Sequence, residues 1–192
     1  MNKQPVVTEA TRIHILNAFW ELYREIPFEK ISVNAIASKA NIHRSTFYRY
    51  FTDTQNVLDA LEDDLLEKIK QDNLYNLGKL FPMLKSMPSE EAMAKGDEFI
   101  SKLLMKHAEK IYYLTNVRGD SHFKDKLYDW LREQAHEFIT PQNSNEFDYL
   151  FTLIFTIMIT NANYCYEHRN EYDPKMITAI SRRVLKNCTE FL

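Results

Sequence analysis

Five polar residues in one short run of the sequence have the chemistry of a nucleic-acid binding surface. Arg44, Ser45, Thr46, Tyr48 and Arg49 place two guanidinium groups, two aliphatic hydroxyls and a phenol within six residues. Guanidinium groups can form paired hydrogen bonds with guanine edges, and hydroxyl groups can donate to phosphate oxygens. An ordinary solvated helix face seldom carries this mixture, so the run is a candidate surface for binding double-stranded DNA.

Two phenylalanines indicate how this run is held in place. Phe47 and Phe51 are four residues apart, so on a helix they point to one side while the polar residues occupy the other. Phenylalanines at this spacing can lock a short helix onto its neighbours. We therefore expect Phe47 and Phe51 in the core and the polar residues at the surface.

The residues before the run favour a helix-turn-helix motif. Ser32 can cap a second helix of roughly eight residues, whose apolar positions form a narrow stripe. Asn41 follows, and asparagine tolerates the left-handed backbone of a sharp turn out of a helix. A third helix begins near His43 or Arg44 and runs to about Tyr50, so the motif covers about residues 32–51.

Two further helices are expected, one before this motif and one after it. The first could be capped by Thr8 and is ended by Pro27. Its apolar positions are Ile13, Leu16, Phe19, Trp20 and Tyr23. Another helix begins at Thr54, and its inward positions are Val57, Leu58, Leu61, Leu65, Leu66 and Ile69. Its acids are expected to face outward, among them Asp59, Glu62 and Asp63.

The run Ile31–Phe51 resembles the DNA-binding signature of the TetR family of transcriptional regulators. Thr46, Phe47 and Tyr48, followed by Phe51, are its most specific part. The resemblance covers about residues 8–66, one third of the chain, because the next helix also carries the family's apolar pair at residues 57–58. It implies an all-α protein with an N-terminal three-helix DNA-binding domain and a C-terminal helical domain for dimerisation and regulation.

The resemblance also implies roles for individual residues. Tyr48 and the start of the second helix near Ser32 would hold phosphates. The residues nearest the base edges would be Arg44, Ser45, Thr46 and Arg49. The sequence departs from the family where Asn41 replaces the usual glycine and Thr54 replaces the usual lysine, which removes a phosphate contact. The simpler alternative is a three-helix bundle with a polar surface helix, but helix length, turn and exposed chemistry together favour DNA binding.

Composition and cap signals predict helices in the rest of the chain as well. Only 3 glycines and 6 prolines occur in 192 residues, which favours long helices over hairpins. We expect helices at about residues 75–86, 89–107, 108–117, 121–139, 145–168 and 174–190. Residues 1–56 carry seven Lys/Arg against five Asp/Glu, and residues 57–192 carry 17 against 22. We take 1–56 as the DNA-binding domain and 57–192 as the regulatory one.

The last two predicted helices are candidates for a homodimer interface. The helix at 145–168 is apolar around most of its circumference, and the helix at 174–190 adds an apolar stripe. Proteins resembling TetR commonly form a two-fold four-helix interface from such a pair. Two-fold pairing would place two recognition helices about 34 Å apart and predicts an inverted-repeat operator.

Aromatic residues in the C-terminal part suggest a small apolar or aromatic effector. They include Phe81, Phe99, Tyr112, Tyr113, Phe123, Trp130, Phe138, Tyr149 and Tyr164. Core packing explains most of them, whereas the resemblance implies that some line an effector cavity. An effector that prefers a conformer with wrongly spaced recognition helices would release the protein from DNA, as in a repressor.

Other functional classes fit the sequence less well. No glycine-rich phosphate loop occurs, and no two of the six histidines are four residues apart, so we expect no catalytic site, metal or cofactor. Cys165 and Cys188 match no redox spacing and are read as apolar packing residues. The absence of a signal and of a long apolar stretch predicts a cytoplasmic protein without a membrane span. The alternative function is a DNA-binding adaptor or co-activator controlled by a partner protein.

Overall fold

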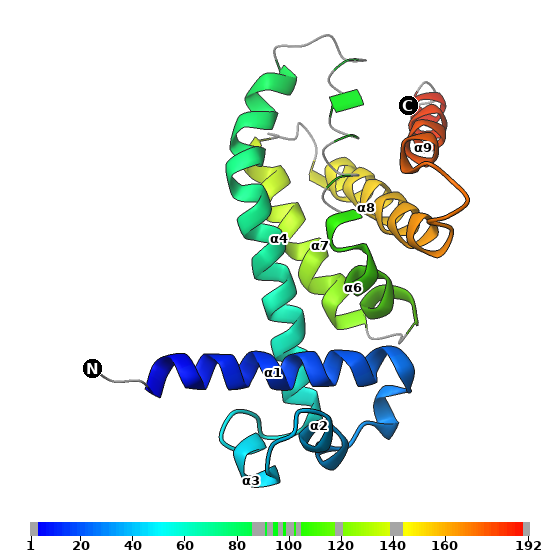
Figure 1. Cartoon of the computed structure of the whole chain (residues 1–192). Helices are drawn as coiled ribbons and strands as arrows, with labels where there is room; N and C mark the ends of the chain where they lie inside the picture. The colour runs from blue at the N-terminus through cyan, green and yellow to red at the C-terminus, as the bar shows by residue number, and fades with distance from the viewer. Residues whose placement is uncertain are drawn as a thin grey trace. The chain divides into compact units, whose positions relative to one another are not determined.

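The computed structural model describes residues 4–85, 91, 94–95, 98, 102, 105–117, 121–138 and 144–189. The regular elements in these ranges are all helices, which confirms the predicted all-α fold (Figure 1). The chain forms two compact units, Met1–Glu67 and Lys68–Leu192. The long helix α4 (Thr54–Lys85) contributes its first part to one unit and its remainder to the other.

Helix α1 (Gln4–Glu25) begins earlier than the sequence predicts. Thr8 therefore lies within the helix, and the expectation that it caps α1 is wrong. Pro5 stands in the first turn, where a proline costs no helical hydrogen bond because the N–H groups there have no acceptor within the helix. The helix ends before Pro27, as predicted, and the short 3₁₀ helix η1 (Phe28–Lys30) follows.

The apolar face of α1 is built around residues four apart. Ile15, Phe19 and Tyr23 are fully buried, and Leu16 is nearly so. Ile13 is 46% exposed, so its predicted place in this stripe is wrong. Ile13 precedes Ile15 by two residues and therefore lies roughly 200° around the helix from it, on the opposite face.

Helix α4 begins at Thr54, as predicted, behind a reciprocal cap. Asp53 Oδ1 accepts from Asn56 N at 2.8 Å, and Asn56 Oδ1 accepts from Thr52 N at 3.3 Å. These two contacts satisfy backbone donors at the helix start. The helix continues to Lys85, so the separate helix expected at about 75–86 is instead part of α4. No proline stands between Thr54 and Phe81 to end it earlier.

The predicted inward face of α4 is confirmed with one correction. All six apolar residues assigned to it, from Val57 to Ile69, are buried. Glu62 is buried too, at 0% exposure, although the sequence analysis placed it outward. Glu62 lies four residues after Leu58 and three before Leu65, so it shares their face, and that face is wider than the apolar residues alone indicate.

The second unit contains the remaining helices close to their predicted positions. They are α6 (Ala108–Tyr112), the π-helix η2 (Tyr113–Val117), α7 (Ser121–Phe138), α8 (Ser144–Glu167) and α9 (Pro174–Thr189). Asp173 caps α9 as predicted, since its Oδ1 accepts from Lys175 N at 2.9 Å. Of the helix expected at 89–107, the structure describes only residues 91, 94–95, 98, 102 and 105–107. These are helical except His107, which lies in a turn.

Polar contacts join α8 to its neighbours around an apolar core. Thr115 of η2 donates to Asn163 at 3.2 Å, and Ser181 of α9 donates to Asn161 at 3.0 Å. The buried core residues include Ile111, Leu114, Phe123, Leu127, Phe155 and Ile159. Cys165 is also buried, as its packing interpretation requires, and burial raises the pKa of its thiol. Cys188 lies outside the described side chains.

The nine aromatic residues singled out in the sequence differ in their exposure. Phe123 and Trp130 are buried, whereas Tyr149 and Tyr164 are 65% and 39% exposed. Tyr112 and Tyr113 are half-buried. The side chains that lie outside the described residues are those of Phe81, Phe99 and Phe138. Core packing therefore accounts for part of this set, and two members belong to the surface of α8.

Candidate nucleic-acid interface

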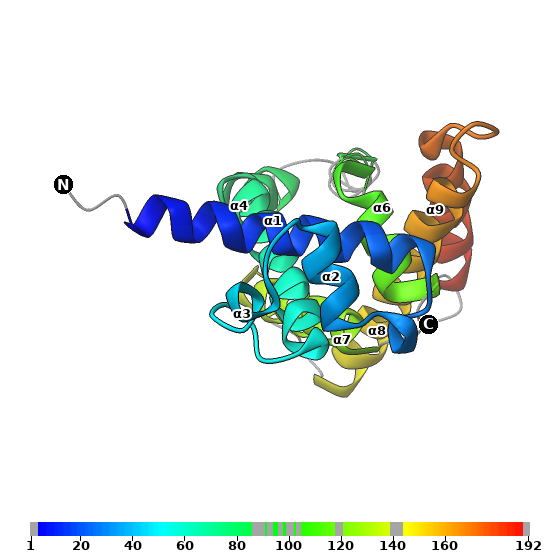
Figure 2. The ribbon, with the colours of Figure 1, turned by 60° about the horizontal axis from the view of Figure 1, so that its bottom comes forward.

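The first helix of the predicted motif is positioned by its cap. Helix α2 (Val33–Lys39) begins after Ser32, whose Oγ accepts from Ala35 N at 3.2 Å. Ile36 and Ala37 are buried, and α2 packs along α1 (Figure 2). Ser32 itself is exposed. The predicted cap is thus present, and it leaves the serine at the surface.

The turn after α2 has the geometry that its asparagine permits. Asn41 has a φ of 49°, in the left-handed region. Ile42 N donates to Ala37 O at 3.0 Å, and Asn41 N donates to Ser38 O at 3.1 Å. This pair of bonds is a Schellman motif, which commonly uses glycine at the position of Asn41. Asparagine adopts the same backbone more readily than other non-glycine residues, so the departure from the family pattern leaves the turn intact.

Helix α3 is shorter than predicted. Its α-helical part covers Arg44–Phe47, and a turn continues to Tyr50. Arg49 N and Tyr50 N donate to carbonyls only three residues back, at 3.2 and 2.9 Å, so the last turn tightens. Phe47 and Phe51 are buried, at 0% and 4% exposure, with ring centroids 5.9 Å apart. The predicted core role of both phenylalanines is confirmed.

The predicted DNA-contacting residues of α3 are mostly at the surface. Arg44, Ser45 and Arg49 are exposed, Tyr48 is 47% exposed and Thr46 is half-buried. Four of them lie on α3 or at its C-cap, and Arg49 lies in the turn that follows. The burial of Phe47 anchors this segment from beneath. The segment thereby presents two guanidinium groups and three hydroxyl groups on a short stretch of backbone.

Two of these side chains are bonded to each other. Arg44 Nη2 and Nε donate to the hydroxyl oxygen of Tyr48 at 2.9 and 3.2 Å. The guanidinium carbon also lies 5.4 Å from the centre of the Tyr48 ring, a cation–π distance. Arg44 and Tyr48 are four residues apart, the spacing at which side chains meet on a helix. The residue types alone indicate two independent contacts and do not predict this pair.

Ion pairs fasten the helices that support α3 within the first unit. Arg12 Nη2 and Nη1 of α1 donate to the Asp64 carboxylate of α4 at 2.9 and 3.3 Å. Hydrogen bonding to Asp64 raises the pKa of the Arg12 guanidinium. Lys39 of α2 lies 3.0 Å from Glu21 of α1. Neither pair was predicted, because the partners lie far apart in the sequence.

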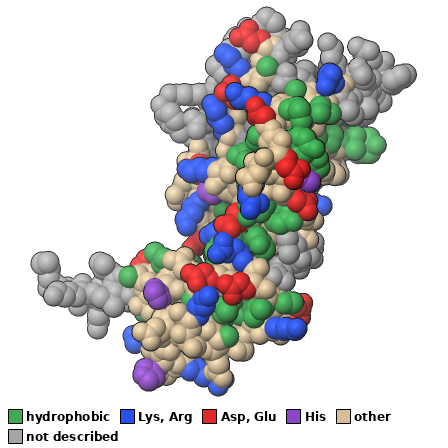
Figure 3. All heavy atoms as spheres, turned by 45° about the vertical axis from the view of Figure 1, so that its right-hand side comes forward, with side chains coloured by type: hydrophobic (Ala, Val, Ile, Leu, Met, Phe, Trp, Pro, Cys, Tyr) green, Lys and Arg blue, Asp and Glu red, His purple; other side chains and the backbone are tan. Residues whose placement is uncertain are grey.

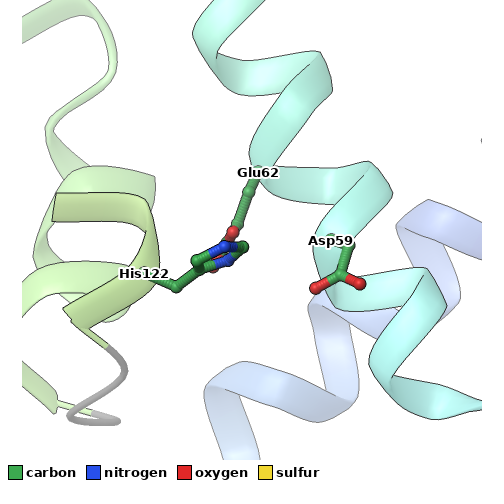
Figure 4. A group of neighbouring side chains, drawn as sticks. All are labelled: Asp59, Glu62 and His122. Atoms are coloured by element: carbon green, nitrogen blue, oxygen red, sulfur yellow. The ribbon is translucent and has the colours of Figure 1, made fainter. Parts of the chain in front are cut away.

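Three side chains of types that bind metals are shown in Figure 4. Asp59 and Glu62 lie on α4, the first half-buried and the second buried, and His122 is an exposed residue of α7. Asp59 and Glu62 belong to the first unit and His122 to the second. Because the three residues are divided between the units, we assign no metal site to them.

A comparison with protein families decides what kind of domain holds α2 and α3. Residues 15–61 match the model of the bacterial regulatory proteins of the tetR family. Residues 15–61 therefore form a tetR-family domain. The match spans the buried half of α1, the whole helix-turn-helix and the start of α4. The family and the fold are those of transcriptional regulators.

Solved structures extend this likeness of fold beyond the matched segment, over most of the chain. The fatty acid degradation regulator FadR from Bacillus halodurans has a TM-score of 0.60 at 16% identity, covering 96% of each chain. FadR from Bacillus subtilis, solved with stearoyl-CoA, has a TM-score of 0.57 at 19% identity, covering 91% of this chain and 95% of that one. A TetR regulator from Streptococcus agalactiae has 0.55 at 22%, covering 90% and 92%. No curated protein sequence matches the chain.

No helix among the described residues is long and apolar enough to cross a membrane. Helix α8 comes nearest in composition, but polar residues such as Asp148 and Asn163 lie along it. Arg132 of α7 donates to Asp148 Oδ1 at 2.6 and 3.0 Å.

Proposed function

We propose that this tetR-type regulator binds DNA sequence-specifically through the surface of α2 and α3, and acts as a repressor. The DNA-binding residues we assign are Ser32, Arg44, Ser45, Thr46, Tyr48 and Arg49. The observation that carries the proposal is the polar surface of α3 anchored by Phe47, in the segment that matches the tetR model. A rigid helix with exposed donors is the arrangement that reads base edges in a major groove.

The assigned residues divide into two groups by their chemistry. Ser32 and Tyr48 present hydroxyls, which donate to phosphate oxygens and fix the position of the protein on the duplex. Arg44 and Arg49 present guanidinium groups, which pair with guanine O6 and N7. Ser45 and Thr46 lie between them and can donate to base edges or accept from them. We keep residues 1–56 as the DNA-binding region and 57–192 as the regulatory region.

We propose that α8 and α9 form the homodimer interface. Both helices expose large apolar side chains that their own unit leaves uncovered. On α8 these are Tyr149 (65%), Leu150 (37%), Leu153 (38%) and Ile154 (51%), and on α9 they are Met176 (44%) and Ile180 (43%). Hydrophobic side chains also gather over the second unit in the space-filling view (Figure 3). Such faces support pairing with a second copy, which places two α3 helices on one duplex.

We propose that a long-chain apolar compound, a fatty acid or its CoA ester, is the effector. One of the similar structures is named as a fatty acid degradation regulator, and another was solved in complex with stearoyl-CoA. The second unit is rich in apolar and aromatic side chains, which suits an acyl chain. Melting curves with saturated fatty acids and acyl-CoAs of increasing length test this, because a ligand of the native state raises the midpoint. If none does, control by a partner protein becomes the better account.

Selection from a pool of random duplex DNA tests the DNA-binding proposal. The purified protein is mixed with the pool at two salt concentrations, and the retained duplexes are sequenced. The expected result is an inverted repeat, with binding that weakens as salt rises because phosphate contacts release counterions. If no sequence is enriched at either salt concentration, the protein does not bind DNA sequence-specifically on its own.

A further inference from the structure

We propose that Tyr48 is a positioning residue for base recognition. It holds Arg44 so that the end edge of the guanidinium, formed by Nη1 and Nη2, is the edge that is free for a base. This inference rests on the proposed DNA-binding function. It assigns to Tyr48 a second task besides its contact with phosphate. The hydroxyl oxygen accepts from Arg44 and its hydrogen can donate to a phosphate, so the two tasks are compatible.

The contacts of Arg44 fix both its direction and its rotation. Nε and Nη2 lie 3.2 and 2.9 Å from the same Tyr48 oxygen, so the side edge of the guanidinium faces the hydroxyl. The guanidinium carbon is 5.4 Å from the ring centre. The ring of Tyr48 in turn meets Phe47 edge-on at 5.6 Å, and Phe47 is fully buried. Arg44 is thus tied to the core through Tyr48 and Phe47.

The contact with Tyr48 leaves part of the Arg44 guanidinium free to bind DNA. A guanidinium has five N–H groups in a fixed plane, and two of them are used on Tyr48. The end edge keeps one N–H on each of Nη1 and Nη2, and a pair of parallel donors matches O6 and N7 of guanine. Tyr48 accepts both bonds from Arg44, so its own O–H can still donate to a phosphate oxygen.

The contact with Tyr48 orders the side chain of Arg44 in the free protein, before it binds DNA. An exposed arginine has many rotamers, and ordering it on binding reduces affinity. Arg44 that already lies against Tyr48 loses less freedom when it meets a base. The gain applies to the base pair that Arg44 reads, whereas a phosphate contact from Tyr48 applies to every sequence equally.

The variant Tyr48→Phe removes the hydroxyl and keeps the ring. Its affinity is measured for the duplex selected by the wild type and for duplexes changed at one base pair at a time. We expect Tyr48→Phe to lower discrimination by roughly 3- to 10-fold at the base pair where Arg44→Ala also loses it, and to leave other base pairs unchanged. Loss of the phosphate contact lowers affinity equally for all duplexes, so a uniform loss with unchanged discrimination at the base pair of Arg44 would overturn the positioning role.

Tyr50→Phe is the matched control. Tyr50 lies in the turn after α3 and is half-buried, and within the described residues its hydroxyl makes no hydrogen bond with Arg44. This variant should keep the discrimination of the wild type. In the background of Arg44→Ala, Tyr48→Phe should produce no further loss of discrimination. An additional loss at the same base pair would show that Tyr48 acts there without Arg44.

A measurement without DNA separates the failure of this inference from failure of the DNA-binding proposal. The Nε–H resonance of Arg44 is assigned by its absence in Arg44→Lys, and its exchange with water is followed by NMR in the free protein. Exchange should be faster in Tyr48→Phe than in the wild type or Tyr50→Phe. Equal exchange rates would overturn the inference even if the wild type selects an operator. Slower exchange in the wild type, with no selected operator, would remove the DNA-binding proposal and leave the Arg44–Tyr48 pair as a contact without a role in base recognition.

Discussion

A buried ring next to exposed donors is the arrangement on which the recognition surface depends. Phe47 is fully enclosed, and the residues on both sides of it, Thr46 and Tyr48, reach the surface. The position of the donors therefore depends on a side chain that touches no DNA. Substitutions of Phe47 should therefore reduce the stability of the fold, whereas substitutions of the exposed donors should reduce DNA binding.

Phe47→Ala tests the anchoring role directly. Removing a fully buried phenylalanine leaves a cavity, so we expect a loss of about 3–5 kcal/mol in the free energy of unfolding of the first unit. Urea unfolding followed by circular dichroism gives this value. Ser45→Ala is the control, because Ser45 is exposed and its change should stay within about 0.5 kcal/mol. Equal stability of the two variants would contradict the anchoring role.

The hydrogen bonds of the Asp72 carboxylate predict how the stability of the fold changes at low pH. Hydrogen bonds from Lys106 and then His107, at 2.6 and 2.9 Å, lower the pKa of Asp72. A carboxyl whose pKa is lower in the folded state stabilises the fold above its unfolded pKa, about 3.9, and this contribution is lost as pH falls through the folded pKa. Asp72→Asn should therefore reduce stability at neutral pH and show less further loss below about pH 4. Thermal melting against pH measures both effects, and parallel curves for variant and wild type would contradict the role of this carboxylate.

At the scale of the elements, the turn between α2 and α3 sets the direction of α3, the proposed recognition helix. Asn41 takes a left-handed backbone there, a conformation that most residues other than glycine and asparagine disfavour. We expect Asn41→Ala to reduce the free energy of unfolding by about 1–2 kcal/mol and to weaken DNA binding accordingly. Asn41→Gly should match the wild type or exceed it in stability. If alanine were tolerated as well as glycine in urea unfolding, the left-handed turn would not be the constraint we describe.

Local signals predicted the start of several helices well. Ser32 and Asp173 were read as caps and both accept a backbone N–H, and Asn41 was read as the turn residue. Each of these assignments depends on a residue and its nearest neighbours in the chain. Such short-range preferences are present in the sequence itself. The same applies to Phe47 and Phe51, whose spacing alone places them on one face.

The sequence failed where distant contacts decide the outcome. Glu62 looked like an outward acid but shares the buried face of α4, and Ile13 looked like a core residue but lies on the far side of α1. Burial at such positions depends on which helix packs opposite them. The rotamer of Arg44 was not predicted either, because nothing in the residue types says that it will bond Tyr48 instead of water.

At the scale of the whole molecule, the apolar surface of α8 and α9 leads to a prediction about assembly. Ile154 is 51% exposed, so Ile154→Asp should leave folding nearly unchanged while it weakens the dimer at least tenfold. Sedimentation over a range of micromolar concentrations measures this. Asn170→Asp introduces the same charge at an exposed position in the turn after α8 and should leave the dimer intact. A wild type that sediments as a monomer throughout would contradict the proposed interface.

The central claim is that Arg44 of α3 and Arg49 of the turn after it read bases, and affinity for the selected duplex tests this claim most directly. Arg44→Ala, Arg49→Ala and the double variant are titrated against that duplex and against a random one, with melting curves to show that they fold. We expect each single variant to lose about 1–3 kcal/mol on the selected duplex and the double variant to approach its affinity for random DNA. An unchanged affinity of the folded double variant for the selected duplex would contradict the assignment of α3 as the recognition element.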